Sequence, residues 1–151
     1  MLRSRGVNRV SMGIQTLNDR ILSAVQRRHS GREALAACDL LVESGLVVNV
    51  DLIYGLPGQT EAEFRSDFEA VVARGVHSVC TYSLRVNELT PIVRAVREGE
   101  HLDLSWLVRW RVLVQRTAEE LGFTQTRWHV FQRTHQTGLG AKEAIRFKDR
   151  T

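Results

Sequence analysis

The chain has 151 residues, of which 43% are hydrophobic and 25% charged, and its formal net charge is +4. These values fit one globular domain and exclude a disordered chain, and no apolar run reaches the roughly 18 residues of a membrane span. Two cysteines are too few for a disulfide framework, a zinc ribbon or a self-contained iron–sulfur site. The N-terminus has no apolar signal core, so we expect a cytoplasmic protein.

Hydrophobic periodicity predicts β-strands that alternate with helices along most of the chain. The strand over 46–54 is the most apolar and β-branched of them. Two capping boxes, Ser30 with Glu33 and Thr60 with Glu63, predict where two helices begin. In chain order we predict a strand over 7–15, a helix capped by Asn18, a helix over 30–45, a strand over 46–54, a helix over 60–75, a strand over 76–84, a short helix to about Gly99, a helix over 103–121 and a fourth strand over 123–131.

This order of strands and helices is typical of βαβ units, which place parallel strands in one sheet through right-handed crossovers. We therefore predict an α/β fold with a parallel sheet. Residues 134–151 lose the periodic pattern and are predicted to form an irregular tail.

The predicted strands carry polar residues at alternate positions, where parallel strands buried on both faces are apolar. In the second strand Asn49 and Asp51 share one face, and the intervening apolar residues share the other. The polar sets of the first and third strands are Ser11, Gly13, Gln15 and His77, Thr81, Ser83. A curved sheet accounts for this pattern, because its apolar face meets the helices and its polar face lines a concave interior.

Five polar residues are candidates for function. A carboxylate inside so apolar a strand costs several kcal/mol unless it is paired or ligand-bound, so we favour a functional role for Asp51. Gln15 and Ser83 lie at strand ends, where α/β barrels place their active sites, although a structural role is the simpler interpretation for Gln15 alone. Arg27 is either solvated or reaches a ligand carboxylate. His129 is either a core or rim histidine or an acid–base group.

The two cysteines have different predicted environments. Cys38 is expected in the core on its helix, and Cys80 faces either the core or the interior. A lone thiol is weak support for catalysis, so neither cysteine is a predicted catalytic residue.

Three ordered segments, residues 6–15, 27–29 and 49–60, resemble the oxygen-independent coproporphyrinogen III oxidase-like family of radical S-adenosylmethionine (SAM) proteins. The resemblance covers roughly residues 5–133. It implies the second half of a (β/α) partial TIM barrel with parallel strands, which holds SAM and a [4Fe–4S] cluster in the full-length family. The family also includes haem chaperones, and radical SAM methyltransferases have related cores.

The resemblance also implies roles for individual residues. Gln15, Arg27 and Asp51 fall on positions similar to the SAM-contacting set, with Asp51 suited to ribose hydroxyls and Arg27 to the methionyl carboxylate. Ser83 would contact the adenosyl group with its backbone. His129 lies in a weaker match to a downstream segment and is the one catalytic candidate. The substrate would be a small molecule, a porphyrinogen or haem.

Departures from the family pattern matter as much as the matches. The CxxxCxxC motif that ligates the cluster is missing, as is the glycine-rich segment that contacts the SAM amino group. We therefore expect a fragment that holds part of the SAM site, binds no cluster and is inactive alone.

Within the family that the sequence resembles, an oxidase, a haem chaperone and a radical SAM methyltransferase all stay open. Two alternatives to a fragment of an enzyme also stay open. One is a non-catalytic module that binds SAM or haem. The other is a basic nucleic-acid-binding fragment, for which residues 1–32 offer seven arginines against one aspartate. We favour a chain without a nucleic-acid partner, because no basic run has interleaved aromatic residues. The sequence leaves the oligomeric state open.

Overall fold

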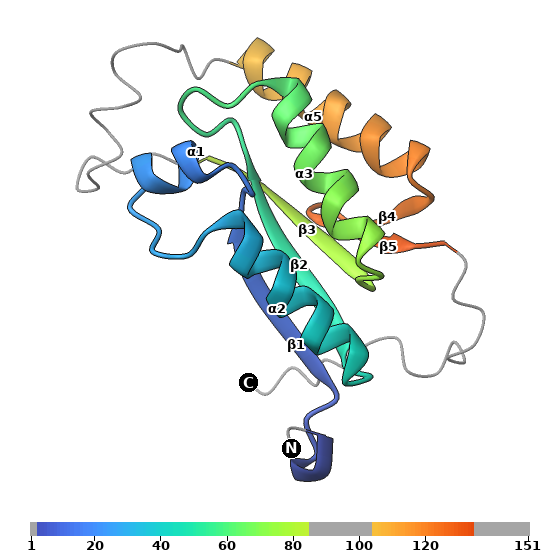
Figure 1. The fold of residues 1–151 in the computed structure, drawn as a ribbon. Helices are drawn as coiled ribbons and strands as arrows, with labels where there is room; N and C mark the ends of the chain where they lie inside the picture. The colour runs from blue at the N-terminus through green and yellow to red at the C-terminus, as the bar shows by residue number, and fades with distance from the viewer. Residues whose placement is uncertain (1–2, 85–103, 135–151) are drawn as a thin grey trace, which may run out of the picture.

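A five-stranded sheet with helices α2, α3 and α5 on one face organises the part of the chain that the structure, a computed structural model, describes (Figure 1). The described residues are 3–84 and 104–134. The elements are η1 (Arg3–Arg5), β1 (Arg9–Gln15), α1 (Asp19–Ala24), α2 (Gly31–Glu43), β2 (Val47–Tyr54), α3 (Glu61–Ala73), β3 (Ser78–Ser83), α5 (Leu104–Glu120), β4 (Phe123–Arg127) and β5 (Val130–Arg133). The helix predicted near Gly99 and the tail predicted beyond Thr134 lie outside the described residues.

The strand order is β1-β2-β3-β5-β4. β1, β2 and β3 are parallel, which confirms the predicted α/β fold with crossover helices. β5 pairs antiparallel with β3 and with β4, so the single fourth strand predicted over 123–131 is wrong. The chain turns at residues 128–129 instead. Phe123 and Phe131 are both buried and both odd-numbered, so the period-two pattern runs through the turn without a break.

Both predicted capping boxes are present. The Ser30 hydroxyl accepts from the Glu33 backbone N–H at 3.2 Å, and the Glu33 carboxylate accepts from the Ser30 N–H at 2.8 Å. Thr60 and Glu63 make the same pair at the start of α3, at 3.2 and 2.7 Å. In each box the backbone hydrogen bond to the glutamate lowers the pKa of its carboxyl. Each box satisfies N–H groups that the helix itself cannot pair.

The core fills the space between the sheet and its helices. The helix-facing residues of β2 are almost completely buried, and Tyr54 at the end of that strand stacks on Trp110 of α5 with 6.2 Å between ring centroids. Cys38 lies in this core, as predicted, and burial raises the pKa of its thiol to about 11. Because the thiolate is the reactive form, Cys38 is inert at neutral pH.

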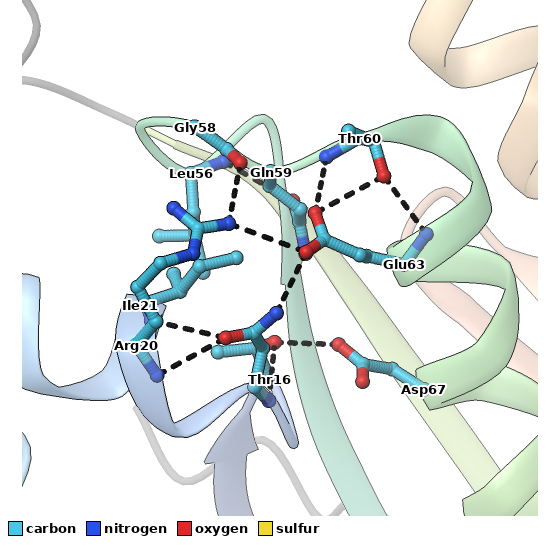
Figure 2. A network of polar contacts seen from close by, with 10 residues as sticks. Thr16, Arg20, Ile21, Leu56, Gly58, Gln59, Thr60, Glu63 and Asp67 are labelled. Carbon is cyan, nitrogen blue, oxygen red and sulfur yellow. Dashed lines mark hydrogen bonds and ion pairs between the residues drawn. The ribbon is translucent and has the colours of Figure 1, made fainter.

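A polar network ties the segment after β1 to the start of α3 (Figure 2). Thr16 donates its hydroxyl to Asp67 at 2.6 Å, and Asn18 donates its amide to Glu63 at 2.7 Å. Arg20 donates to the Gly58 carbonyl at 2.9 Å and also pairs with Glu63. The network therefore fixes the carboxyl end of β1 against the loop that follows β2.

We expect Thr16→Val to destabilise the protein more at pH 8 than at pH 4. Asp67 is only 5% exposed, and burial raises the pKa of its carboxyl to about 6, against the lowering effect of the Thr16 hydrogen bond. A raised folded-state pKa means that the unfolding free energy falls as pH rises from about 4 to 6, because the native state holds the proton more tightly. Without the hydroxyl this pKa rises further, and about 1.5–3 kcal/mol is lost where the carboxylate is charged.

Urea unfolding of both proteins at pH 4 and pH 8 measures this difference. Thr124→Val is the matched control, since Thr124 is exposed and its hydroxyl lies 2.8 Å from that of another exposed threonine, Thr134. Equal losses at the two pH values would show that the Thr16 hydroxyl does not act on the charge of Asp67.

Candidate functional site

Polar side chains line the face of the sheet opposite the helices. Register pairs place Asn49 beside Ser78 and Asp51 beside Cys80 on this polar face. The predicted polar face of β2 is therefore confirmed. The predicted polar set of β3 is wrong, because Thr81 is fully buried on the helix-facing side and the even-numbered residues of β3 share the face of Asp51. Pairing with β2 sets this orientation, which the mixed sequence of β3 leaves ambiguous.

A chain of hydrogen bonds across the polar face ends at Asp51. The Ser78 hydroxyl and the Cys80 thiol both donate to Asn49 Oδ1, at 2.7 and 3.3 Å. Asn49 Nδ2 in turn donates to Asp51 Oδ1 at 2.8 Å. Asn49 is 2% exposed whereas Asp51 is half-buried, so a rigid amide orients a carboxylate that ligands can still reach.

Cys80 is not an activated nucleophile in this setting. Burial raises the pKa of its thiol, and the negative charge of Asp51 raises it further, although the hydrogen bond to Asn49 acts in the opposite direction. The thiol therefore stays protonated at neutral pH and serves as a donor within the network.

Gln15 has an unusual backbone and an unpaired side-chain oxygen. Its φ of 66° lies in the left-handed region, at a bulge in the pairing of β1 with β2. Its Nε2 lies 2.7 Å from the place of a Cβ on Gly13, so the side chain folds back over that glycine, whose partner on β2 is Asp51. Its Oε1 is buried and accepts no hydrogen bond from any described residue. Such strain and such an orphaned acceptor each cost about 1 kcal/mol or more and are typical of ligand sites.

Arg27 lies beyond the end of α1, in the connection to α2. Its guanidinium is exposed and forms no hydrogen bond or ion pair with another described residue. The His29 ring Nε2 lies 3.2 Å from the Ile14 carbonyl, so this connection runs past the end of β1. Arg27 thus lies at the same end of the sheet as Gln15, but the structure forms no contact between the two.

A hollow of about 500 Å³ lies at the carboxyl ends of β2 and β3. Its lining residues are Ile53, Tyr82, Ser83, Leu84 and His129. Ser83 shares the register parity of the buried Tyr54, which suits the predicted backbone role better than a side-chain role. His129, from the turn between β4 and β5, lies with its ring centroid 5.0 Å from that of Tyr82. Tyr82 was not predicted as a site residue; its position at a strand end was the available signal.

The described residues suit parts of SAM but not the iron–sulfur cluster. The Asp51 carboxylate and the orphaned Gln15 Oε1 are acceptors that match hydroxyl or ammonium donors. By contrast, Cys38 is in the core and Cys80 on the opposite face of the sheet, and the described segments hold no cluster of three potential metal-ligating side chains. Three thiolates, which the family uses for the cluster, are not available here.

Residues 1–71 match the model of the Radical SAM superfamily. The heme chaperone HemW of Mycobacterium tuberculosis (strain ATCC 25618 / H37Rv) is 41% identical over 100 residues, which are 66% of this chain and 26% of that protein. The solved coproporphyrinogen III oxidase HemN of Escherichia coli has the same fold, with a TM-score of 0.76 at 22% identity over 90% of this chain and 32% of that one. This chain is similar to part of the radical SAM proteins.

Two further proteins are similar to this chain. Anaerobilin synthase of Escherichia coli O157:H7 is 36% identical over 62% of this chain and 21% of that protein. The archaeal Elp3 of Methanocaldococcus infernus superposes with a TM-score of 0.58 at 28% identity, over 66% of this chain and 24% of that one. The chain spans about a quarter of the length of the curated relatives it matches.

No helix within residues 3–84 and 104–134 is long and apolar enough to cross a bilayer. The cytoplasmic location stays a prediction.

Proposed function

We propose that this chain supplies part of the SAM-binding site of a HemN- or HemW-like radical SAM protein. The observation that carries the proposal is Gln15, which combines a left-handed backbone with a buried, unpaired amide oxygen next to the strand of Asp51. The family match over residues 1–71 supports it, because this stretch contains both residues.

Each residue has a distinct part in the proposed site. Asp51, oriented by Asn49, accepts hydrogen bonds from the ribose hydroxyls, and Gln15 Oε1 accepts a further donor from SAM. Arg27 pairs with the methionyl carboxylate, and the backbone at Ser83 borders the adenosyl group. The cluster that reduces SAM elsewhere in the family is not held by the described residues, so the proposal concerns binding and assigns no reaction step.

Calorimetric titration of the full chain with SAM tests this site. We expect saturable binding that Asp51→Asn weakens by about ten-fold or more, since hydrogen bonds to a charged group contribute about 1.5–3 kcal/mol. Asp39→Asn is the matched control, because Asp39 pairs with Arg74 on the helix side of the sheet. Unchanged affinity in Asp51→Asn, or no binding to the unmodified chain, would overturn the proposal.

The second part of the proposal concerns the small molecule that the protein would bind besides SAM. We infer a porphyrin-type molecule, because the matched relatives are named as a heme chaperone and a coproporphyrinogen III oxidase. The heme chaperone shares 41% identity, whereas the likeness to the oxidase at 22% identity supports the fold alone. Haem binding is therefore the favoured activity, and coproporphyrinogen oxidation the alternative.

A further inference from the structure

Gln15 is the central residue of a tight turn at the end of β1. The Thr16 backbone N–H donates to the carbonyl of Ile14, two residues back, at 2.9 Å, and the φ of Gln15 is 66°. This combination is typical of the γ-turn with positive φ, the rarer and more strained of the two γ-turns. A strained backbone persists only where the surrounding structure holds it, so contacts outside β1 have to fix this turn.

The side chain that follows Gln15 anchors the turn to helix α3. Thr16 is completely buried, and its hydroxyl donates to Asp67 Oδ2 of α3 at 2.6 Å (Figure 2). The same hydroxyl accepts from the Asn18 N–H at 3.2 Å, so it acts as both donor and acceptor. Asp67 is itself almost completely buried, and a backbone hydrogen bond from Leu17 reaches it as well. Two consecutive residues after Gln15 are therefore tied to one buried carboxylate.

The position of the Gln15 amide depends on the backbone of this turn. Its Nε2 lies 2.7 Å from the place of a Cβ on Gly13, so the side chain folds back along β1 into space that the glycine leaves open. The register partner of Gly13 on β2 is Asp51. With an extended φ, Gln15 would continue the direction of β1 and its amide would leave this space. The buried acceptor Oε1 would then no longer lie next to the strand of Asp51.

We propose that Thr16 and Asp67 are positioning residues for SAM, which hold Gln15 in the turn that presents its Oε1 to the ligand. The inference rests on the SAM site proposed above and adds two residues to it. Both are buried, so they act without touching SAM. Asp67 fixes the Thr16 hydroxyl, Thr16 fixes the backbone at Gln15, and Gln15 makes the contact. Loss of the hydroxyl should therefore weaken SAM binding only through Gln15.

Calorimetric titration with SAM at pH 8 compares four forms of the full chain: unmodified, Thr16→Val, Gln15→Ala and the double variant. Burial raises the pKa of Asp67 to about 6, so its carboxylate is charged at this pH. We expect Thr16→Val, which replaces the hydroxyl by a methyl group of similar size, to weaken binding by about ten-fold. In the Gln15→Ala background the same substitution should change affinity by about two-fold or less, because the contact on which it acts is already gone.

Two further variants separate positioning from a general loss of structure. Thr16→Ser keeps the hydroxyl and should restore most of the affinity that Thr16→Val loses. Thr117→Val is the matched control, because Thr117 is also completely buried, on α5, and its hydroxyl has no hydrogen-bond partner among the described residues. It should bind SAM like the unmodified chain. Circular dichroism at the temperature of the titration should show every variant folded.

The backbone chemical shifts of Gln15, measured by NMR on the chain without ligand, test the turn independently of SAM. They should change from left-handed to extended values in Thr16→Val and stay left-handed in Thr16→Ser. A Gln15 that stays left-handed in Thr16→Val, or an equal loss of affinity with and without the Gln15 side chain, would overturn the positioning role and leave SAM binding intact as a function. Absence of saturable SAM binding by the unmodified chain would instead overturn the proposed function and, with it, the role of the turn in binding.

Discussion

Replacement of Phe68 by alanine should lower the free energy of unfolding by about 3–5 kcal/mol. Phe68 is completely buried on α3, and its ring meets Phe123 of β4 and Phe131 of β5 edge-on, with centroids 6.0 and 6.4 Å apart. The substitution removes the aromatic contact between a helix and the hairpin and leaves a cavity that both elements would have to close.

Urea unfolding measures the loss. Leu40→Ala is a suitable control, because Leu40 is 68% exposed on α2 and its truncation should change stability by no more than about 0.5 kcal/mol. A loss below about 1 kcal/mol in Phe68→Ala would show that the hairpin does not depend on this contact.

Gly55→Ala should cost about 2–5 kcal/mol, from two separable causes. Gly55 has a φ of 75°, and a Cβ there would lie 2.1 Å from Trp106 Cζ2 of α5. Gly122 has the same φ of 75° but open space around its Cβ position, so Gly122→Ala incurs only the backbone cost of about 1–2 kcal/mol. The difference between the two variants measures the collision with Trp106.

Urea unfolding and tryptophan fluorescence together report this difference. Gly55→Ala should shift the emission to longer wavelength, because Trp106 is buried and must move toward solvent. Gly122→Ala should leave the emission unchanged. Equal losses of stability in the two variants would show that Trp106 moves aside without cost.

Features set by short stretches of sequence could be predicted. The capping boxes at Ser30 and Thr60 join groups three residues apart, and β2 is apolar enough to be recognised alone. The β4–β5 hairpin could not be predicted in this way, because its turn keeps Phe123 and Phe131 in phase. The orientation of β3 depends on its pairing with β2, which is a contact between distant segments.

The candidate site also contains residues that the sequence singles out and residues whose role depends on distant contacts. Asp51 stands out in the sequence because a carboxylate interrupts an apolar strand. The left-handed backbone of Gln15 depends on a bulge where β1 meets β2, and no local pattern indicates it. Tyr82 and His129 come together only because β5 pairs with β3, so neither their contact nor the hollow could be inferred from the spacing of the two residues.

The pairing of β5 with β3 affects the order in which the protein folds. Cys80 pairs with Val130, a separation in sequence larger than that of any β1–β2 or β2–β3 pair. Closing a longer loop costs more chain entropy before any contact compensates for it. The wall that His129 provides should therefore assemble after the parallel strands, so a chain emerging from the ribosome gains the Asp51 side of this face before the imidazole side.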